Sequence, residues 1–264
     1  MQRETQDDAL TLISLGVLAF VIADITHEAL GHGLATLMLG AKPIILTTCY
    51  FSTQGSDSRW IPAAGGLANV CVGLLSLLFL RASRPRAPQY RCFLALVAAF
   101  NLFFAAAYPA YSGIALFGDW AAVISGLEPV WLWRILLVLV AISGYFLALI
   151  LVAHAFRPFC GSREAKSLQR LRRVTLIPYL AALGAAFLGG IPNPAGWIVS
   201  FTAAVPAAAA SFGLTQLDHF SVTTSSRLPN EAPANILRSN VWIAAAIAAL
   251  ILFVAVLGPG IRFP

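Results

Sequence analysis

The chain has 264 residues, of which 59% are hydrophobic and 11% are charged. Soluble domains carry about 25% charged residues, so this composition excludes an ordinary soluble protein and indicates an integral membrane protein in the lipid bilayer. The formal net charge of +6 does not indicate a nucleic-acid partner. The basic residues gather in short segments between apolar runs, where membrane topology and anionic headgroups account for them.

Long apolar runs predict an all-α polytopic membrane protein with about seven transmembrane helices. The runs lie at 9–39, 62–80, 92–112, 130–156, 174–190, 196–213 and 241–258. The segment IPNPAG at 191–196 leaves two readings of the runs beside it, either two short helices or one broken re-entrant segment.

Two arginine-rich segments, 81–91 and 157–173, set the predicted orientation. Positively charged loops face the cytoplasm, so the alternation of the helices places the N-terminus inside and the C-terminus outside. Polar and turn-forming residues at 214–240 predict a further cytoplasmic loop. The compact basic loops suit a bacterial inner membrane.

The segment 41–61 follows the first apolar run. It has β-branched and aromatic residues from Ile44 to Phe51 and turn formers after them, which predicts a short outer strand or hairpin. An ordinary ordered loop is the alternative. The four cysteines show no C-x-x-C spacing, so we interpret them as reduced residues.

The first apolar run also carries the polar residues that point to function. Residues 25–37 read ITHEALGHGLATL, which places His27, Glu28 and His32 in a run long enough to cross a ~30 Å hydrocarbon core. Asp24 lies there as well. Each ionisable group at this depth costs at least ~2.5 kcal/mol, which indicates a functional site. Hydrogen bonding within a helix bundle, without a metal, is the structural alternative.

The spacing of the histidines leaves two metal-binding geometries open. An H-E-x-x-H helix sets its histidines one turn apart on one zinc ion, and the glutamate activates water. His27 and His32 are five residues apart, so a regular helix would point them ~140° apart. A π-bulge would restore them to one face. A regular helix would instead align Asp24, Glu28 and His32, with Glu28 as a ligand.

Three separated segments carry a family likeness. They are HEALGH at 27–32, the small-residue segment AAGGLANVCVG at 63–73, and the stretch from NLFFAAAYP at 101–109 to GDW at 118–120. In this order they resemble the site-2 protease family of intramembrane zinc metalloproteases. The chain departs from the family pattern by the extra residue between the histidines, by Trp120 in place of glycine, and by a longer step to Asp119.

The resemblance implies a Zn2+ site with three ligands, His27, His32 and Asp119, and it assigns Glu28 as the general base. It places a group of small or polar residues of the second segment at the substrate or in core packing, namely Gly65, Gly66 and Asn69. It also implies a metalloprotease-like membrane core over residues 1–125, to which residues 126–264 add further helices within one membrane domain.

The first functional hypothesis is hydrolysis of a peptide bond in or near a membrane-spanning protein substrate. Segment 44–51 would hold the unwound substrate by strand addition. The first alternative is a non-catalytic relative that binds transmembrane partners. The second is a transporter or a haem-binding membrane protein, since intramembrane histidines also serve those functions.

Overall fold

The computed structural model describes residues 7–82, 87–160, 165–217, 220 and 235–264. The chain is mostly helical, and within these residues six helices are long and apolar enough to cross a membrane. They are Ala9–Met38, Trp60–Ala82, Pro88–Ala115, Val130–Cys160, Ser167–Gly190 and Asn240–Leu257. Six of the seven predicted spans therefore correspond to continuous helices.

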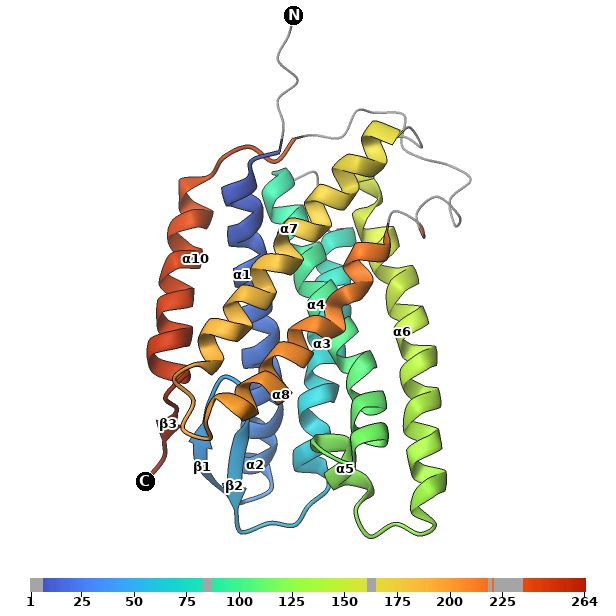
Figure 1. The fold of residues 1–264 in the computed structure, drawn as a ribbon, viewed down its shortest axis with the longest axis vertical. Helices are drawn as coiled ribbons and strands as arrows, with labels where there is room; N and C mark the ends of the chain where they lie inside the picture. The colour runs from blue at the N-terminus through green and yellow to red at the C-terminus, as the bar shows by residue number, and fades with distance from the viewer. Residues whose placement is uncertain (1–6, 83–86, 161–164, 218–219, 221–234) are drawn as a thin grey trace, which may run out of the picture.

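The first span combines α1 (Ala9–Ile25), the π-helix η1 (Thr26–Gly33) and α2 (Leu34–Met38). The next helices are α3 (Trp60–Ala82), α4 (Pro88–Ala115), the short α5 (Asp119–Ile124) and α6 (Val130–Cys160). The last group consists of α7 (Ala165–Gly190), α8 (Trp197–Ala209), the 3-10 helix η2 (Ala210–Gln216), α10 (Asn240–Leu252) and the π-helix η3 (Phe253–Leu257). Figure 1 shows the long helices side by side in one bundle.

The seventh predicted span, 196–213, is not among the six membrane-length helices, and its helical geometry changes along its length. The chain there forms α8, which has 13 residues, and then tightens into η2. Pro206 lies inside α8 and removes one backbone donor, which weakens the helix at that point. A turn at 191–195 separates α8 from α7, so the chain is interrupted at IPNPAG, as both predicted readings require. α7 has 26 residues, so it is longer than the short helix of the first reading.

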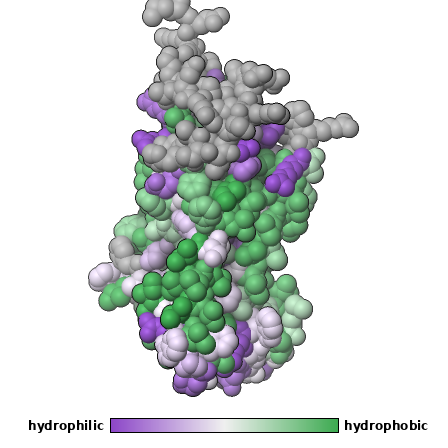
Figure 2. Space-filling model, turned by 90° about the vertical axis from the view of Figure 1, so that its right-hand side faces the viewer, coloured by the Kyte–Doolittle hydropathy of each residue, from purple (hydrophilic) through white to green (hydrophobic). Residues whose placement is uncertain are grey.

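The bundle is centred on α1, whose side chains are buried from several sides. The ring of Phe20 meets Phe100 of α4 and Phe253 of η3 edge-on, at centroid distances of 6.3 and 6.0 Å. Asp8 starts the helix, because its carboxylate accepts the backbone N–H of Thr11 at 2.8 Å. On the outside, Figure 2 shows hydrophobic side chains across the middle of one face and hydrophilic ones toward both ends.

The arginines of the two basic segments that the structure describes lie at one end of the bundle, where α1 begins (Figure 1). Arg170 binds the buried carboxylate of Asp7 there through two hydrogen bonds, of 2.7 and 2.9 Å. Residues 83–86 and 161–164 of these segments, and most of the predicted loop at 214–240, lie outside the described residues.

A small sheet lies at the opposite end of the bundle, with the order β2-β1-β3. The strands are β1 (Lys42–Leu46), β2 (Phe51–Gln54) and β3 (Ile261–Arg262). The first two form the predicted hairpin, and β3 is an addition from the end of the chain that pairs antiparallel with β1. The central strand is thus paired on both sides, and β2 and β3 are the edge strands of the sheet in the described part of the chain.

Candidate metal centre

The two histidines lie on a π-helix, which decides between the two predicted geometries. A π-helix pairs residues five apart, so it brings the side chains of His27 and His32 to the same face. Their rings meet edge-on with centroids 4.8 Å apart. The regular helix that would have aligned Asp24, Glu28 and His32 is not found.

Close packing against α3 accompanies the π-helix. A Cβ atom on Gly31 would lie 2.5 Å from the Cα atom of Gly65, so only glycine allows the two helices to approach this closely. A Cβ atom on Gly65 would lie 2.6 Å from His32 Nε2 and 2.7 Å from His27 Nε2. The bare backbone at Gly65 therefore forms the floor beneath both imidazole rings. The neighbouring Gly66 lies beneath the indole of Trp120 instead.

Asp119 completes a cluster of three groups that can hold a metal ion. Its Oδ2 atom lies 2.9 Å from His27 Nε2 and 3.1 Å from His32 Nε2. The three candidate ligand atoms all lie within 4.8 Å of one another. Zinc bonds of about 2.0–2.1 Å in a tetrahedral site place ligand atoms about 3.4 Å apart, so the Asp119 oxygen must move slightly away from both imidazoles and the widest separation in the cluster must shorten.

The far sides of both rings are fixed by hydrogen bonds. His27 Nδ1 donates to Asn69 Oδ1 at 2.7 Å, and His32 Nδ1 donates to the carbonyl of Ile61 at 2.8 Å. The amide of Asn69 in turn donates to Asn101 Oδ1 at 2.8 Å, which turns its oxygen toward the imidazole. This assignment directs both Nε2 atoms toward Asp119, the arrangement of histidine ligands whose other nitrogen is held by an outer hydrogen bond.

The hydrogen-bond partners of the two imidazoles determine which atoms of the site carry protons. Each imidazole faces an acceptor at both nitrogens, so in the absence of a metal each Nε2 donates a proton to Asp119. Burial raises the pKa of Asp119, but the hydrogen bonds and positive charge of His27 and His32 outweigh burial and hold it well below its usual range. A divalent cation fits the site because it replaces those protons.

Local backbone structure presents Asp119 to the histidines. After α4 ends, Leu116 adopts the left-handed conformation with φ 54°, and Gly118 has φ 84° immediately before α5. The hydroxyl of Tyr108 accepts the backbone N–H of Asp119 at 3.3 Å. Arg134 Nε donates to a carbonyl near the end of α4 at 2.7 Å. Tyr108 carries no motif that would have assigned it this role, and the place of Arg134 near the outer end of its helix favoured a side chain extended toward the membrane interface.

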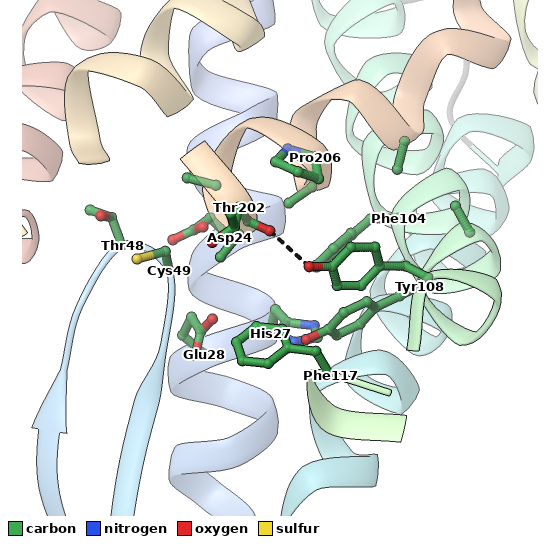
Figure 3. A pocket seen from close by; sticks show the side chains of 16 residues that line it. Asp24, His27, Glu28, Thr48, Cys49, Phe104, Tyr108, Phe117, Thr202 and Pro206 are labelled. Carbon is green, nitrogen blue, oxygen red and sulfur yellow. Dashed lines mark hydrogen bonds between the residues drawn. The ribbon is translucent and has the colours of Figure 1, made fainter. Parts of the chain in front are cut away.

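Glu28 lies beside the cluster without a hydrogen-bond partner. It is 7% exposed, and its Oε2 atom is buried and unpaired among the residues that the structure describes. Glu28 and His27 line a pocket with a cavity volume of about 170 Å³, between η1, α4 and α8. Figure 3 shows Glu28 and His27 in this pocket, with the β1–β2 turn on one side and Tyr108 on the other. A proton acceptor is thus available next to the candidate metal ligands.

Some of the site residues predicted from the sequence lie at the cluster and its pocket, and others lie behind the cluster. The cluster brings together His27, His32 and Asp119, with Glu28 at the pocket, whereas Asn69 lies behind His27 and is fully buried. Asn69 therefore holds a ligand and does not line the pocket. Comparisons with protein families, with curated proteins and with solved structures found no match to this chain.

Proposed function

We propose that this protein is an intramembrane zinc metalloprotease of the site-2 type. The observation that carries the proposal is the convergence of His27 and His32, five residues apart on η1, with Asp119 from a distant segment. The extra residue between the histidines supported the non-catalytic alternative. The π-helix accommodates that residue, so the spacing no longer argues against metal binding.

The three ligand groups suit zinc. Two imidazoles and one carboxylate make a ligand set typical of catalytic zinc sites, which keep one position open for water or substrate. A zinc ion held by His27, His32 and Asp119 would supply Lewis-acid chemistry, polarising a peptide carbonyl and making water nucleophilic near neutral pH. Two of the three ligands, His27 and His32, lie on a helix that has the length of a membrane span.

Glu28 acts as the general base in this proposal. Its unpaired Oε2 takes a proton from the attacking water as the new carbon–oxygen bond forms at the substrate carbonyl. The same carboxyl group then gives the proton to the amide nitrogen as the carbon–nitrogen bond breaks. The products are a carboxyl terminus and an amino terminus.

A helical substrate must unwind before hydrolysis, because a helical peptide bond is shielded by its own backbone. The prediction that segment 44–51 holds the extended chain needs correction, since β1 is already paired with β2 and β3. β2, over Phe51–Gln54, is one of the two edge strands, and Gly33 of η1 lies next to the Phe51 ring. We infer that the substrate strand adds to β2.

The orientation follows from the basic end of the bundle. Described arginines gather where α1 begins, so that end would face the cytoplasm of a bacterial inner membrane. The sheet and α5 lie at the other end. Hydrolysis would then take place in the outer half of the bilayer on a membrane-spanning protein.

Metal content tests the site. Protein purified in mild detergent should hold about one zinc ion per chain, and His32→Ala and Asp119→Ala should lose it. Unchanged helical circular dichroism in both variants would exclude misfolding as the cause. Wild-type protein without tightly bound metal would refute the proposal, and a haem absorbance band would favour the haem-binding alternative.

Cleavage tests the reaction. Wild-type protein should cut a reporter transmembrane segment, and Glu28→Gln should reduce the rate by about 100-fold or more while keeping its zinc. Zinc-loaded wild type that binds the reporter without cutting it would support the non-catalytic alternative.

A further inference from the structure

The pocket beside Glu28 continues to a second unpaired carboxylate. Asp24 lies one helical turn before Glu28 and lines the same pocket. Its Oδ2 atom is buried and has no hydrogen-bond partner among the described parts of the chain. Figure 3 places Asp24 above Glu28, close to Thr202 of α8. The proposed hydrolysis uses Glu28 and the three metal ligands and leaves Asp24 without a role.

Aromatic side chains of α4 form one wall of this pocket. The rings of Phe104, Tyr108 and Tyr111 stack in a row, with centroids 5.3 and 6.1 Å apart. Tyr111 donates its hydroxyl proton to the carbonyl of Thr202 at 3.1 Å, which ties this wall to α8. On the α8 side the lining is mainly alanine and proline. The carboxylates thus face a mostly apolar space with aromatic faces along it.

Carboxyl groups beside aromatic rings favour the binding of a cation in this pocket. An unpaired carboxylate in an apolar site is unfavourable until a charged donor pairs with it. Aromatic faces attract ammonium and guanidinium groups as well. Asp24 and Glu28 both place a carboxyl group in one pocket, and the basic side chain in the described lining, His27, directs its ring nitrogens to Asn69 and Asp119 and not to Asp24.

The separation of Asp24 from Glu28 sets the length of the ligand. Four residues along a helix correspond to about 6 Å. A peptide carbonyl placed at Glu28 would therefore have Asp24 within reach of a long side chain next to the reacting bond. Lysine and arginine are long enough to span that distance.

We propose that Asp24 determines specificity by binding the ammonium or guanidinium group of a basic substrate residue next to the hydrolysed bond. The inference deepens the proposed function and rests on it for the identity of the ligand as a peptide. Asp24 is then the residue that selects where the substrate is cut.

A binding experiment with paired peptides tests this inference. The probes are two fluorescently labelled peptides that differ at one position, which carries lysine in one and norleucine in the other. Norleucine keeps the unbranched apolar chain and lacks the ammonium group. Fluorescence anisotropy in detergent measures both affinities, for metal-loaded and for chelator-treated protein.

Wild-type protein should bind the lysine peptide about tenfold more tightly than the norleucine peptide. Asp24→Asn should abolish this preference, whereas Asp24→Glu should retain part of it. Asp57→Asn is the matched control, because Asp57 is exposed and lies outside the pocket lining. The control should bind like wild type.

Equal binding of the two peptides by wild type would overturn the inference. So would an unchanged preference in Asp24→Asn, or the failure of both peptides to bind. The measurement needs neither metal nor hydrolysis. A protein that prefers the lysine peptide but cuts no reporter segment would support Asp24 as a cation-binding residue and would refute the proposed protease. A protein that cuts the reporter segment without preferring the lysine peptide would support the protease and refute the role of Asp24.

Discussion

Replacing Gly65 with alanine is the sharpest test of the metal centre. The added methyl group would lie 2.6 Å from His32 Nε2 and 2.7 Å from His27 Nε2. Carbon–nitrogen contacts of this kind normally begin near 3.4 Å, so the rings must move by roughly 0.8 Å. Metal ligands tolerate displacements of only about 0.2 Å.

The displacement is therefore several times what a zinc site accepts. We expect Gly65→Ala to lower zinc affinity by at least about 10–100-fold, the loss seen when groups that orient histidine ligands are removed. The helix α3 should remain folded, because alanine stabilises a helix relative to glycine by about 0.5–1 kcal/mol. Competition with a chromophoric chelator measures the affinity, and circular dichroism reports the helix content.

The adjacent Gly66→Ala is the matched control. Its Cβ atom would meet the Trp120 ring at 3.3 Å, a contact that a slight movement of the indole relieves. This variant should bind zinc nearly as well as wild type. Wild-type zinc affinity in Gly65→Ala would refute the arrangement of both imidazoles above that glycine.

Three further predictions concern the surroundings of the site. Asn69→Ala should weaken zinc binding by about 10–100-fold, measured by chelator competition, because His27 loses the hydrogen bond that orients it. Zinc binding should release protons and weaken as the pH falls from about 8 to about 5.5, because protonated imidazoles cannot bind metal. Asp119 does not cause this loss: its lowered pKa keeps it ionised, and its contribution disappears only below about pH 4. Burial raises the pKa of Cys49 to about 12, so iodoacetamide should alkylate it about 1000-fold more slowly in folded protein at pH 8 than in denatured protein.

Each of these predictions has its own control. Asn193→Ala removes another buried asparagine, one that donates to Cys49 Sγ at 3.0 Å, and it should leave zinc affinity unchanged. Calorimetry in two buffers of different ionisation enthalpy counts the released protons, and a pH-independent affinity would contradict the assigned protonation. The alkylation is followed by mass in a variant that keeps Cys49 as its only cysteine, and equal rates in folded and denatured protein would contradict its burial.

The long helices were predictable because continuous apolar runs are a strong signal. The span predicted at 9–39 corresponds to the helix Ala9–Met38, and the span predicted at 130–156 corresponds to the helix Val130–Cys160. At 196–213 the residues are equally apolar, and the helix there changes from α8 to the 3-10 helix η2. Apolar composition does not distinguish an α-helix from a 3-10 helix, so it could not predict this change.

The sequence predicted which residues form the site better than it predicted how they are arranged. Motif order pointed to His27, His32 and Asp119, but the choice between a regular helix and a π-helix depends on packing of Gly31 against Gly65, which the sequence does not display. Arg134 supports the segment before Asp119 from a separate helix, and no local pattern marks such a partner.

The π-helix also changes what an insertion means for this chain. One added residue in a regular helix turns every later side chain by about 100°, whereas here the wide turn absorbs it and α2 continues along the same axis. Leu30 is 54% exposed on that turn. Deleting Leu30 would leave the histidines four residues apart on an ordinary helix, so the chain stands one residue away from the shorter spacing, and either spacing would bring both imidazoles to one face of the helix.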